Sequence, residues 1–205
     1  YYTAVAVVNG VAYNTFVEAY EAANPGDTIT LLRSDIGTGI VIDKDITIDG
    51  NGYTIDGAET ASIFRVVNNA HVILKNIKLI NARGSDGAAV SLTANENVEI
   101  INSEFTNNIA TNNGGAVYVA AGDSSTITSS LSITDSTFVH NKAYNGGAIY
   151  VSGSLASIKS STFKHNNATN NGGSVFSDAG ARFDGNVYEY EYAGNDGGVI
   201  FLNST

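Results

Sequence analysis

Residues 138–150 read Phe-Val-His-Asn-Lys-Ala-Tyr-Asn-Gly-Gly-Ala-Ile-Tyr, and this stretch decides the fold because it recurs along the chain. Close copies occupy residues 105–118 and 163–176, a degenerate copy occupies residues 188–201, and a weaker one occupies residues 77–88. Self-similarity of this kind indicates a repeat protein in which one small unit stacks many times.

The spacing of the copies predicts what the unit is. Phe138 to Phe163 and Phe163 to Tyr188 are 25 residues each, while Phe105 to Phe138 is 33, with the excess placed near residues 122–125 as an insertion between coils. Short β-branched runs between Gly and Asn turns suit a coil of three short strands, whereas helical repeats need longer periodic segments. We therefore expect an all-β, single-stranded right-handed parallel β-helix, a solenoid with an N-terminal capping α-helix.

One domain is expected over residues 1–205, because no change in composition marks a boundary. Apolar residues spaced three and four apart predict a helix over about 14–23, which ends before Pro25-Gly26. Residues 1–27 would form the N-terminal cap, and residues 28–205 would form about seven coils. The chain contains no Met, so we expect a processed product or a fragment of a longer protein.

Composition narrows the function classes. Asp and Glu total 20 against 10 Lys and Arg, and the formal net charge of -10 repels phosphate backbones, so no nucleic-acid partner is expected. Cysteine is absent, which removes disulfides and thiolate metal sites. No apolar run approaches the roughly 20 residues that span a bilayer, so this segment is not expected to insert into a membrane.

Stacked coils place equivalent residues in columns that run along the solenoid. The first residues of the copies predict an internal aromatic column, and the asparagines three positions later predict a ladder of amide hydrogen bonds that Glu191 breaks. The Gly-Gly pairs are expected to turn with positive φ, and no Lys-Ser/Thr follows them, so they are not phosphate loops. The structural positions are Phe105, Phe138, Phe163 and Tyr188; Asn108, Asn141 and Asn166; and Gly114, Gly146, Gly172 and Gly197.

Phe-x-x-Asn followed by Gly-Gly-Ala-(Ile/Val) resembles the repeat of chlamydial polymorphic outer-membrane proteins and of adhesin-like proteins of gut methanogens. Residues 8–50, with Asn-Pro-Gly-Asp-Thr-Ile and Ile-Thr-Ile-Asp-Gly, look like the opening of bacterial and archaeal surface β-helices of pectate-lyase-like fold. The resemblance implies a secreted or cell-surface protein with an adhesive role. Copies at residues 172–175 and 197–200 depart from the Gly-Gly-Ala pattern.

Enzymes also occur on such folds, so the carboxylates must be considered as possible catalytic residues. Asp43, Asp45 and Asp49 are the densest group and could act as acid and base, but Asp-Lys-Asp and Asp-Gly read equally well as turns. His140 and His165 share one repeat position without a carboxylate nearby in the motif. We predict no catalytic residue, no metal and no cofactor.

A second aromatic column follows the glycines and alternates with aliphatic residues. If the aliphatics point inward, the aromatics form an exposed stripe suited to stacking on sugars; the alternative is that they pack inside or under a loop. The candidate ligand-binding residues are Tyr118, Tyr150, Phe176 and Phe201.

The resulting prediction is an extracellular structural and adhesive module that binds glycans or surface proteins. The alternatives are a polysaccharide lyase or glycoside hydrolase, and a stalk without a ligand. Unpaired strand edges near residues 201–205 predict possible end-to-end self-association.

Overall fold

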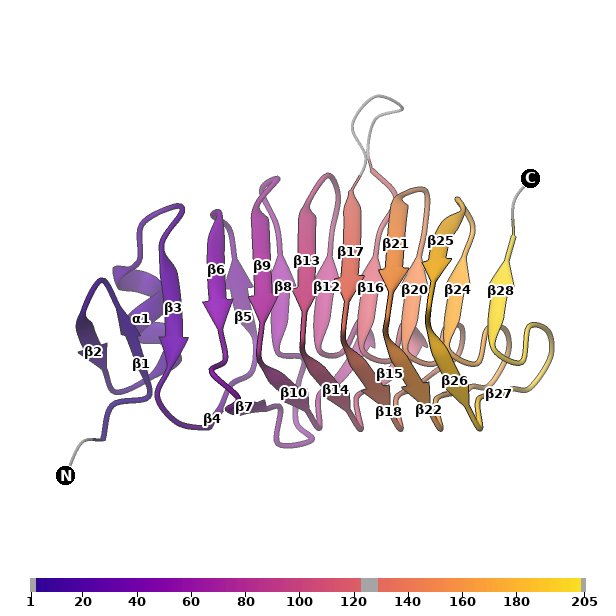
Figure 1. The fold of residues 1–205 in the computed structure, drawn as a ribbon, viewed down its shortest axis with the longest axis horizontal. Helices are drawn as coiled ribbons and strands as arrows, with labels where there is room; N and C mark the ends of the chain where they lie inside the picture. The colour runs from indigo at the N-terminus through magenta and orange to yellow at the C-terminus, as the bar shows by residue number, and fades with distance from the viewer. Residues whose placement is uncertain (1–2, 123–128, 204–205) are drawn as a thin grey trace.

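The computed structural model describes residues 3–122 and 129–203. It is an all-β parallel solenoid with one short helix, as predicted, and its coils follow one another along a single axis (Figure 1). The predicted right hand stays a prediction. Residues 123–125 of the insertion expected between coils lie outside the described residues.

Four sheets run along the solenoid: sheets A, B and C each contain one strand from every coil, and sheet D begins at the third coil. Sheet A follows the order β2 (Val11–Tyr13), β1 (Ala6–Val8), β3 (Thr28–Leu31), β6 (Ile46–Asp49), β9 (His71–Lys75), β13 (Asn97–Ile101), β17 (Ser130–Thr134), β21 (Leu155–Lys159) and β25 (Ala181–Asp184). Sheet B contains β4 (Asp35–Ile36), β7 (Thr54–Asp56), β10 (Lys78–Ile80), β14 (Glu104–Thr106), β18 (Thr137–Val139), β22 (Thr162–Lys164) and β26 (Val187–Glu189).

The two remaining sheets close each coil. Sheet D contains β11 (Arg83–Asp86), β15 (Ile109–Asn113), β19 (Lys142–Ala143), β23 (Asn167–Ala168) and β27 (Tyr192–Ala193). Sheet C contains β5 (Ile40–Ile42), β8 (Phe64–Val66), β12 (Val90–Leu92), β16 (Val117–Val119), β20 (Ile149–Val151), β24 (Val175–Ser177) and β28 (Ile200–Leu202). Counted from β3 as coil 1, six turns lead to β25, and β26 to β28 complete a seventh layer.

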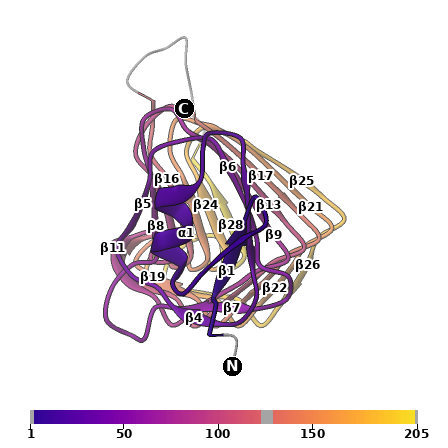
Figure 2. The same cartoon turned by 90° about the vertical axis from the view of Figure 1, so that its left-hand side faces the viewer.

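The N-terminal segment covers the first coil. Helix α1 (Phe16–Ala22) begins at Thr15, whose side chain accepts from the Glu18 N–H while the Glu18 carboxylate accepts from the Thr15 N–H. Figure 2 shows α1 lying across the end of the coil stack. Phe16 is buried there and its ring contacts Phe64, so the helix seals apolar surface that coil 1 would otherwise expose.

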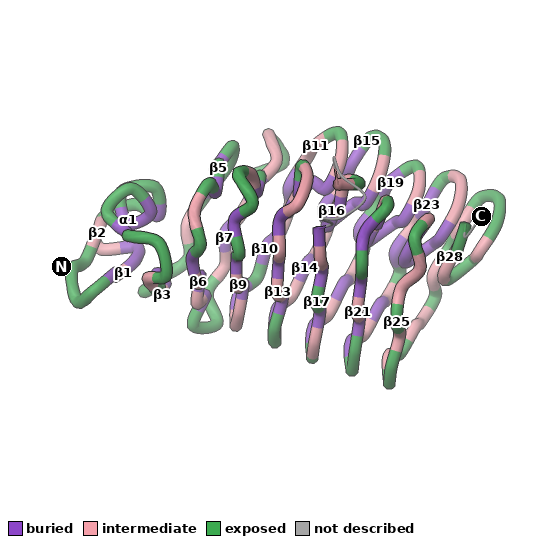
Figure 3. The backbone as a smooth tube through the Cα atoms, turned by 90° about the horizontal axis from the view of Figure 1, so that it is seen from above, coloured by how far each residue is buried: buried purple, intermediate pink, exposed green. Residues whose placement is uncertain are grey.

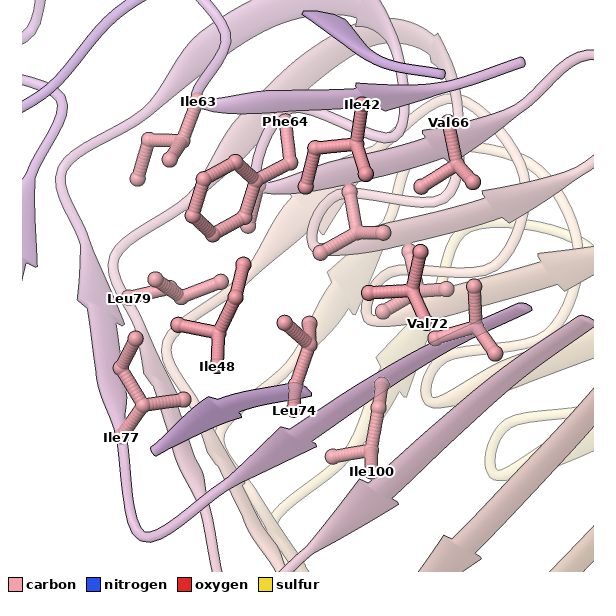
Figure 4. Packing of buried hydrophobic residues seen from close by; sticks show 14 of the residues in the cluster. Ile42, Ile48, Ile63, Phe64, Val66, Val72, Leu74, Ile77, Leu79 and Ile100 are labelled. Atoms are coloured by element: carbon pink, nitrogen blue, oxygen red, sulfur yellow. The ribbon is translucent and has the colours of Figure 1, made fainter. Parts of the chain in front are cut away.

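Buried residues alternate with less buried ones along most strands, as Figure 3 shows by colour. The interior of the first coils is mainly aliphatic, with Ile48, Leu74 and Ile100 stacked from sheet A toward Leu79 of sheet B (Figure 4). From coil 4 onward the sheet B position becomes aromatic. A continuous apolar core therefore runs through the molecule, and it leaves the outer faces of the sheets to carry function.

Candidate binding surface

The predicted internal column lies inside the solenoid. Phe105, Phe138 and Phe163 are fully buried on neighbouring strands, with ring centroids 4.8 Å and 4.9 Å apart and almost parallel planes. Tyr188 continues the stack at 5.1 Å from Phe163. These rings stabilise the coils and are not available to a ligand.

The predicted asparagine ladder is also buried. Nδ2 of Asn108 donates to Oδ1 of Asn141 at 3.0 Å, and Nδ2 of Asn141 donates to Oδ1 of Asn166 at 2.9 Å. Each Oδ1 also accepts a backbone N–H from the preceding coil, as Asn141 does from Asn108 at 3.1 Å. Each Nδ2 also reaches a carbonyl of that coil, so all the polar groups of these amides are satisfied.

The expectation that Glu191 breaks this ladder is wrong. Its carboxylate accepts from both the N–H and Nδ2 of Asn166, at 3.2 Å and 3.4 Å, and from the Ser174 hydroxyl. Because a carboxylate only accepts, it is a suitable last member for a row of donors. Burial raises the pKa of Glu191, although these hydrogen bonds oppose the shift.

The structure contains a second buried ladder, formed by serine hydroxyls, that was not predicted from the sequence. The Ser103 N–H donates to the Ser136 hydroxyl, and the Ser136 N–H donates to the Ser161 hydroxyl, each at 3.1 Å. Asn186 ends this row by accepting from the Ser161 N–H. The sequence signal was a serine two residues before each phenylalanine of the internal column. Because serine is common in turns, this recurrence did not stand out.

The Gly-Gly pairs form the tight connections before four of the sheet C strands, β16, β20, β24 and β28. Gly146 has φ of +62°, and a Cβ placed on it would meet the Ile149 carbonyl oxygen at 2.1 Å. Gly114, Gly172 and Gly197 also have positive φ. The glycines thus allow the backbone to turn and return directly to the next strand.

The candidate stripe projects from the outer face of sheet C. Val117, Ile149 and Val175 are fully buried, so the alternating aromatics point away from the core. Tyr118, Tyr150 and Phe201 are half-buried, whereas Phe176 is 8% exposed and lies between its two neighbours. Strands β16, β20, β24 and β28 carry the four side chains in adjacent coils (Figure 1).

The stripe differs from the expected row of open rings. Successive centroids are 5.6, 4.7 and 5.0 Å apart with planes within 23° of parallel, which is offset stacking. Tyr150 and Phe176 therefore have a ring on each face. Tyr118 ends the stack, and its neighbour in the preceding coil is Ser91, which is too small to cover a phenol ring.

Carboxylates lie around this end of the stripe. Burial raises the pKa of the Tyr118 phenol, and the negative charges of Asp86 and Asp178 raise it further. Burial likewise raises the pKa of Tyr150, with Asp178 as the strongest charged influence. Both tyrosines are therefore neutral hydroxyl groups at physiological pH, able to donate a hydrogen bond.

Asp86 has a structural role as well. Nδ2 of Asn113 donates to it at 3.0 Å, Asn145 donates to Asn113 at 3.1 Å, and Asn170 donates to Asn145 at 2.9 Å. This surface ladder fixes the carboxylate beside the stripe. Asp178 is fixed by the Ser152 hydroxyl and the Gly153 N–H, at 2.9 Å and 2.7 Å.

The other residues weighed from the sequence have separate local roles. Asp43 accepts from the Tyr20 hydroxyl at 2.7 Å, Asp45 accepts from the His71 N–H at 2.7 Å, and Asp49 pairs with Lys75 at 3.3 Å. The rings of His140 and His165 stack at the surface, 5.0 Å apart. Within residues 3–122 and 129–203, no three His, Asp or Glu side chains gather as metal ligands.

A groove of about 510 Å³ lies where sheet A turns into sheet B. Asp49, Glu104 and Asp135 line it together with an amide row in which Asn102 donates to Asn76 and Asn76 donates to Asp49. Lys78 pairs with Glu104 at 3.5 Å, so two of the three carboxylates already have cationic partners.

Comparison with known protein families finds a repeat to which two parts of the chain are similar. Residues 102–120 and 135–152 are similar to the Chlamydia polymorphic membrane protein repeat, and they lie in consecutive coils. This similarity of two coils confirms the resemblance inferred from the motifs. No curated protein and no solved structure matches the chain. In the part of the chain that the structure describes, no helix is long and apolar enough to cross a membrane.

Proposed function

We propose that this chain is an extracellular structural and adhesive module of a secreted or cell-surface protein, and that it binds a glycan with the end of its aromatic stripe. The two matched repeats support a surface-type β-helix. The observation that carries the proposal is the outward-facing Tyr118 ring, which has an aromatic neighbour on one side and Ser91 on the other.

The chemistry of this position fits a sugar. The apolar face of a pyranose stacks on an aromatic ring, and its hydroxyls need hydrogen-bond acceptors and donors at the ring edge. Tyr118 supplies the ring and a neutral hydroxyl, while Asp86 supplies fixed acceptor oxygens. The stack toward Tyr150 holds the Tyr118 ring in place, which lowers the entropic cost of binding.

The stripe itself provides the test, because two tyrosines in the same stack differ in one respect. Tyr118→Ala should reduce binding in a glycan array or cell-adhesion assay at least tenfold. Tyr150→Ala should reduce it less, since both faces of that ring are covered. Tyr144→Ala, which removes an exposed tyrosine of the Tyr150 coil outside the stripe, should leave binding unchanged.

Stability must be measured in parallel. Each stripe variant should lose about 1 kcal/mol, the size of an aromatic pair, and remain folded. Equal losses of binding for Tyr118→Ala and Tyr144→Ala would contradict the proposed site. A wild-type chain that binds neither glycans nor surface proteins would contradict the adhesive function and leave a stalk without a ligand.

A further inference from the structure

A second groove, of about 320 Å³, lies on the outer face of sheet A in coils 5 to 7. Its floor is formed by Leu131 and Ala156, and its walls combine hydroxyl, cationic and apolar side chains. The lining side chains that face outward are Ser130, Ser132, Leu155, Ser157, Lys159 and Arg182.

The strand register explains why these groups meet. Ser130 pairs with Leu155, and Ser132, Ser157 and Arg182 form one row across three strands. Lys159 is two residues after Ser157 on the same strand, so it projects from the same face. Two cations and three serine side chains therefore share one shallow depression.

Lys159 and Arg182 are exposed, and neither forms an ion pair with any residue of the described ranges. Asp184 is the strand neighbour of Lys159, yet the two do not come within ion-pair distance. This differs from Lys75, Lys78 and Lys164, which all pair with carboxylates on adjacent strands. The chain as a whole has a net charge of -10, so a groove with two cations outside any ion pair of the described residues differs from the acidic character of the protein.

The hydroxyls of Ser132 and Ser157 also have no hydrogen-bond partner among the described residues, whereas Ser130 donates to Asn97 at 2.6 Å. Leu155 is 68% exposed at the edge of the groove. The groove thus offers hydrogen-bonding hydroxyls, an apolar contact and two positive charges within the size of a small-ligand site.

We propose that this groove binds an acidic glycan, in which a carboxylate or sulfate group lies between Lys159 and Arg182 and the ring hydroxyls bond to the serines. The net negative charge of the whole chain disfavours an extended polyanion such as RNA or an anionic membrane, because such a partner would meet repulsion outside the groove. A short acidic oligosaccharide presents its charge only locally. The site lies on a different sheet from Tyr118, so it adds a second binding surface to the proposed adhesive module.

The experiment measures binding of the full chain to three oligosaccharides of matched length: a sulfated one derived from heparin, a uronate from polygalacturonic acid, and neutral dextran. Binding of at least one acidic probe should exceed that of dextran and weaken as salt increases. The double variant Lys159→Gln/Arg182→Gln should lose at least tenfold in affinity. Comparing the affinities for the sulfated probe and the uronate probe shows whether the groove prefers sulfate or carboxylate.

The matched control is Arg33→Gln/Lys142→Gln, which removes two exposed cations elsewhere and changes the net charge equally. It should bind the acidic probe like the wild type. Equal loss in both double variants would overturn the proposal, because the effect would then be long-range charge. Stronger binding of RNA or of phosphatidylserine vesicles than of either acidic sugar would also overturn it. The Tyr118 variants should still bind the acidic probe, which separates this site from the stripe.

Discussion

Each coil has two corners, one between its sheet A and sheet B strands and one directly after its sheet B strand. The backbone N–H groups at these corners find different hydrogen-bond acceptors in coil 2 and in coils 3 to 6. In coil 2 the corners are two long turns, Gly50–Gly52 and Gly57–Glu59, in which the first and last N–H groups donate to backbone carbonyls of coil 3. In coils 3 to 6 each corner has one residue with positive φ, such as Asn107 or His140, and the next N–H donates to a side chain of the following coil.

The difference shows why the repeat contains Ser and Asn at fixed places. A one-residue corner turns the buried N–H away from the carbonyls of the next coil, and a buried N–H without a partner is costly. Ser at the first corner and Asn at the second supply the missing acceptor. In coil 3 the corresponding residues are Ile77 and Ala82, which pack against Gly50 and Gly57 of coil 2 and have no side-chain acceptor.

The largest loss of stability is expected in the internal aromatic column, which lies in the coils whose corner N–H groups donate to side chains. Phe138→Ala should destabilise the protein by about 3–5 kcal/mol, through lost burial and the cavity left behind. Leu79→Ala, in the same column on the aliphatic side, should cost about 1 kcal/mol less because Leu79 takes part in no ring stack. Urea unfolding of the two variants measures the difference, and equal costs would show that stacking adds nothing to burial.

Asn141→Leu should destabilise by about 1–3 kcal/mol, because the N–H and Nδ2 of Asn108 lose a buried acceptor. The matched control is Asn145→Leu in the surface ladder, where water can replace the lost bonds and the cost should stay within about 0.5 kcal/mol. Thermal unfolding followed by circular dichroism compares them. Similar melting temperatures for the two variants would mean that the buried ladder does not stabilise the corner.

Ser136→Ala should cost about 1 kcal/mol, since it removes one acceptor, for the Ser103 N–H, and one donor, to the Thr134 carbonyl. Ser132→Ala, on the outer face of the neighbouring strand, should change stability within about 0.5 kcal/mol. Hydrogen exchange at the Ser103 amide gives a local readout, which should become faster only in the Ser136 variant. Unchanged exchange there would argue against a serine ladder.

The features that could be predicted from the sequence are those carried by residue types that stand out and recur once per coil. Large rings at Phe105, Phe138 and Phe163 and amides at the following Asn positions recur with the coil, and stacking forces identical residues into contact. The serine ladder was missed because Ser is common in turns and its acceptor role depends on a corner geometry that the sequence does not display. Glu191 was misread because a departure from a pattern looks like a break, although a row of donors requires an acceptor at its end.

The alternation with Val117 and Ile149 located the aromatic stripe in the sequence but left open whether its rings face outward or pack inside or under a loop. The sequence could not tell that its rings would stack on one another, because that depends on side-chain torsions shared by neighbouring coils. The groove of Lys159 and Arg182 was missed altogether. Those residues are separated by a full coil, and only the strand register brings them together.

The smallest effect concerns the carboxylates that end the ladders, and it depends on pH. Burial raises the folded-state pKa of Glu191, so its charged form destabilises the protein above that pKa and the penalty disappears as the pH falls. Burial alone would raise the pKa of Asp49 too, but hydrogen bonds from Asn76 and Asn51 and the contact with Lys75 hold it below its ordinary value. Asp49 therefore stabilises the fold above its unfolded pKa, and this contribution is lost as the pH falls through its folded pKa.

Glu191→Gln should consequently raise the melting temperature at pH 7, by less than the ~2–4 °C that about 1 kcal/mol gives a chain of this length. Asp49→Asn should lower the melting temperature at the same pH. Both differences should shrink toward zero in acid, where each wild-type carboxyl is protonated in the folded and unfolded states alike. A Glu191→Gln variant that is destabilised at pH 7 would mean that the buried ladder needs a charged acceptor, so that its hydrogen bonds outweigh the cost of burying the charge.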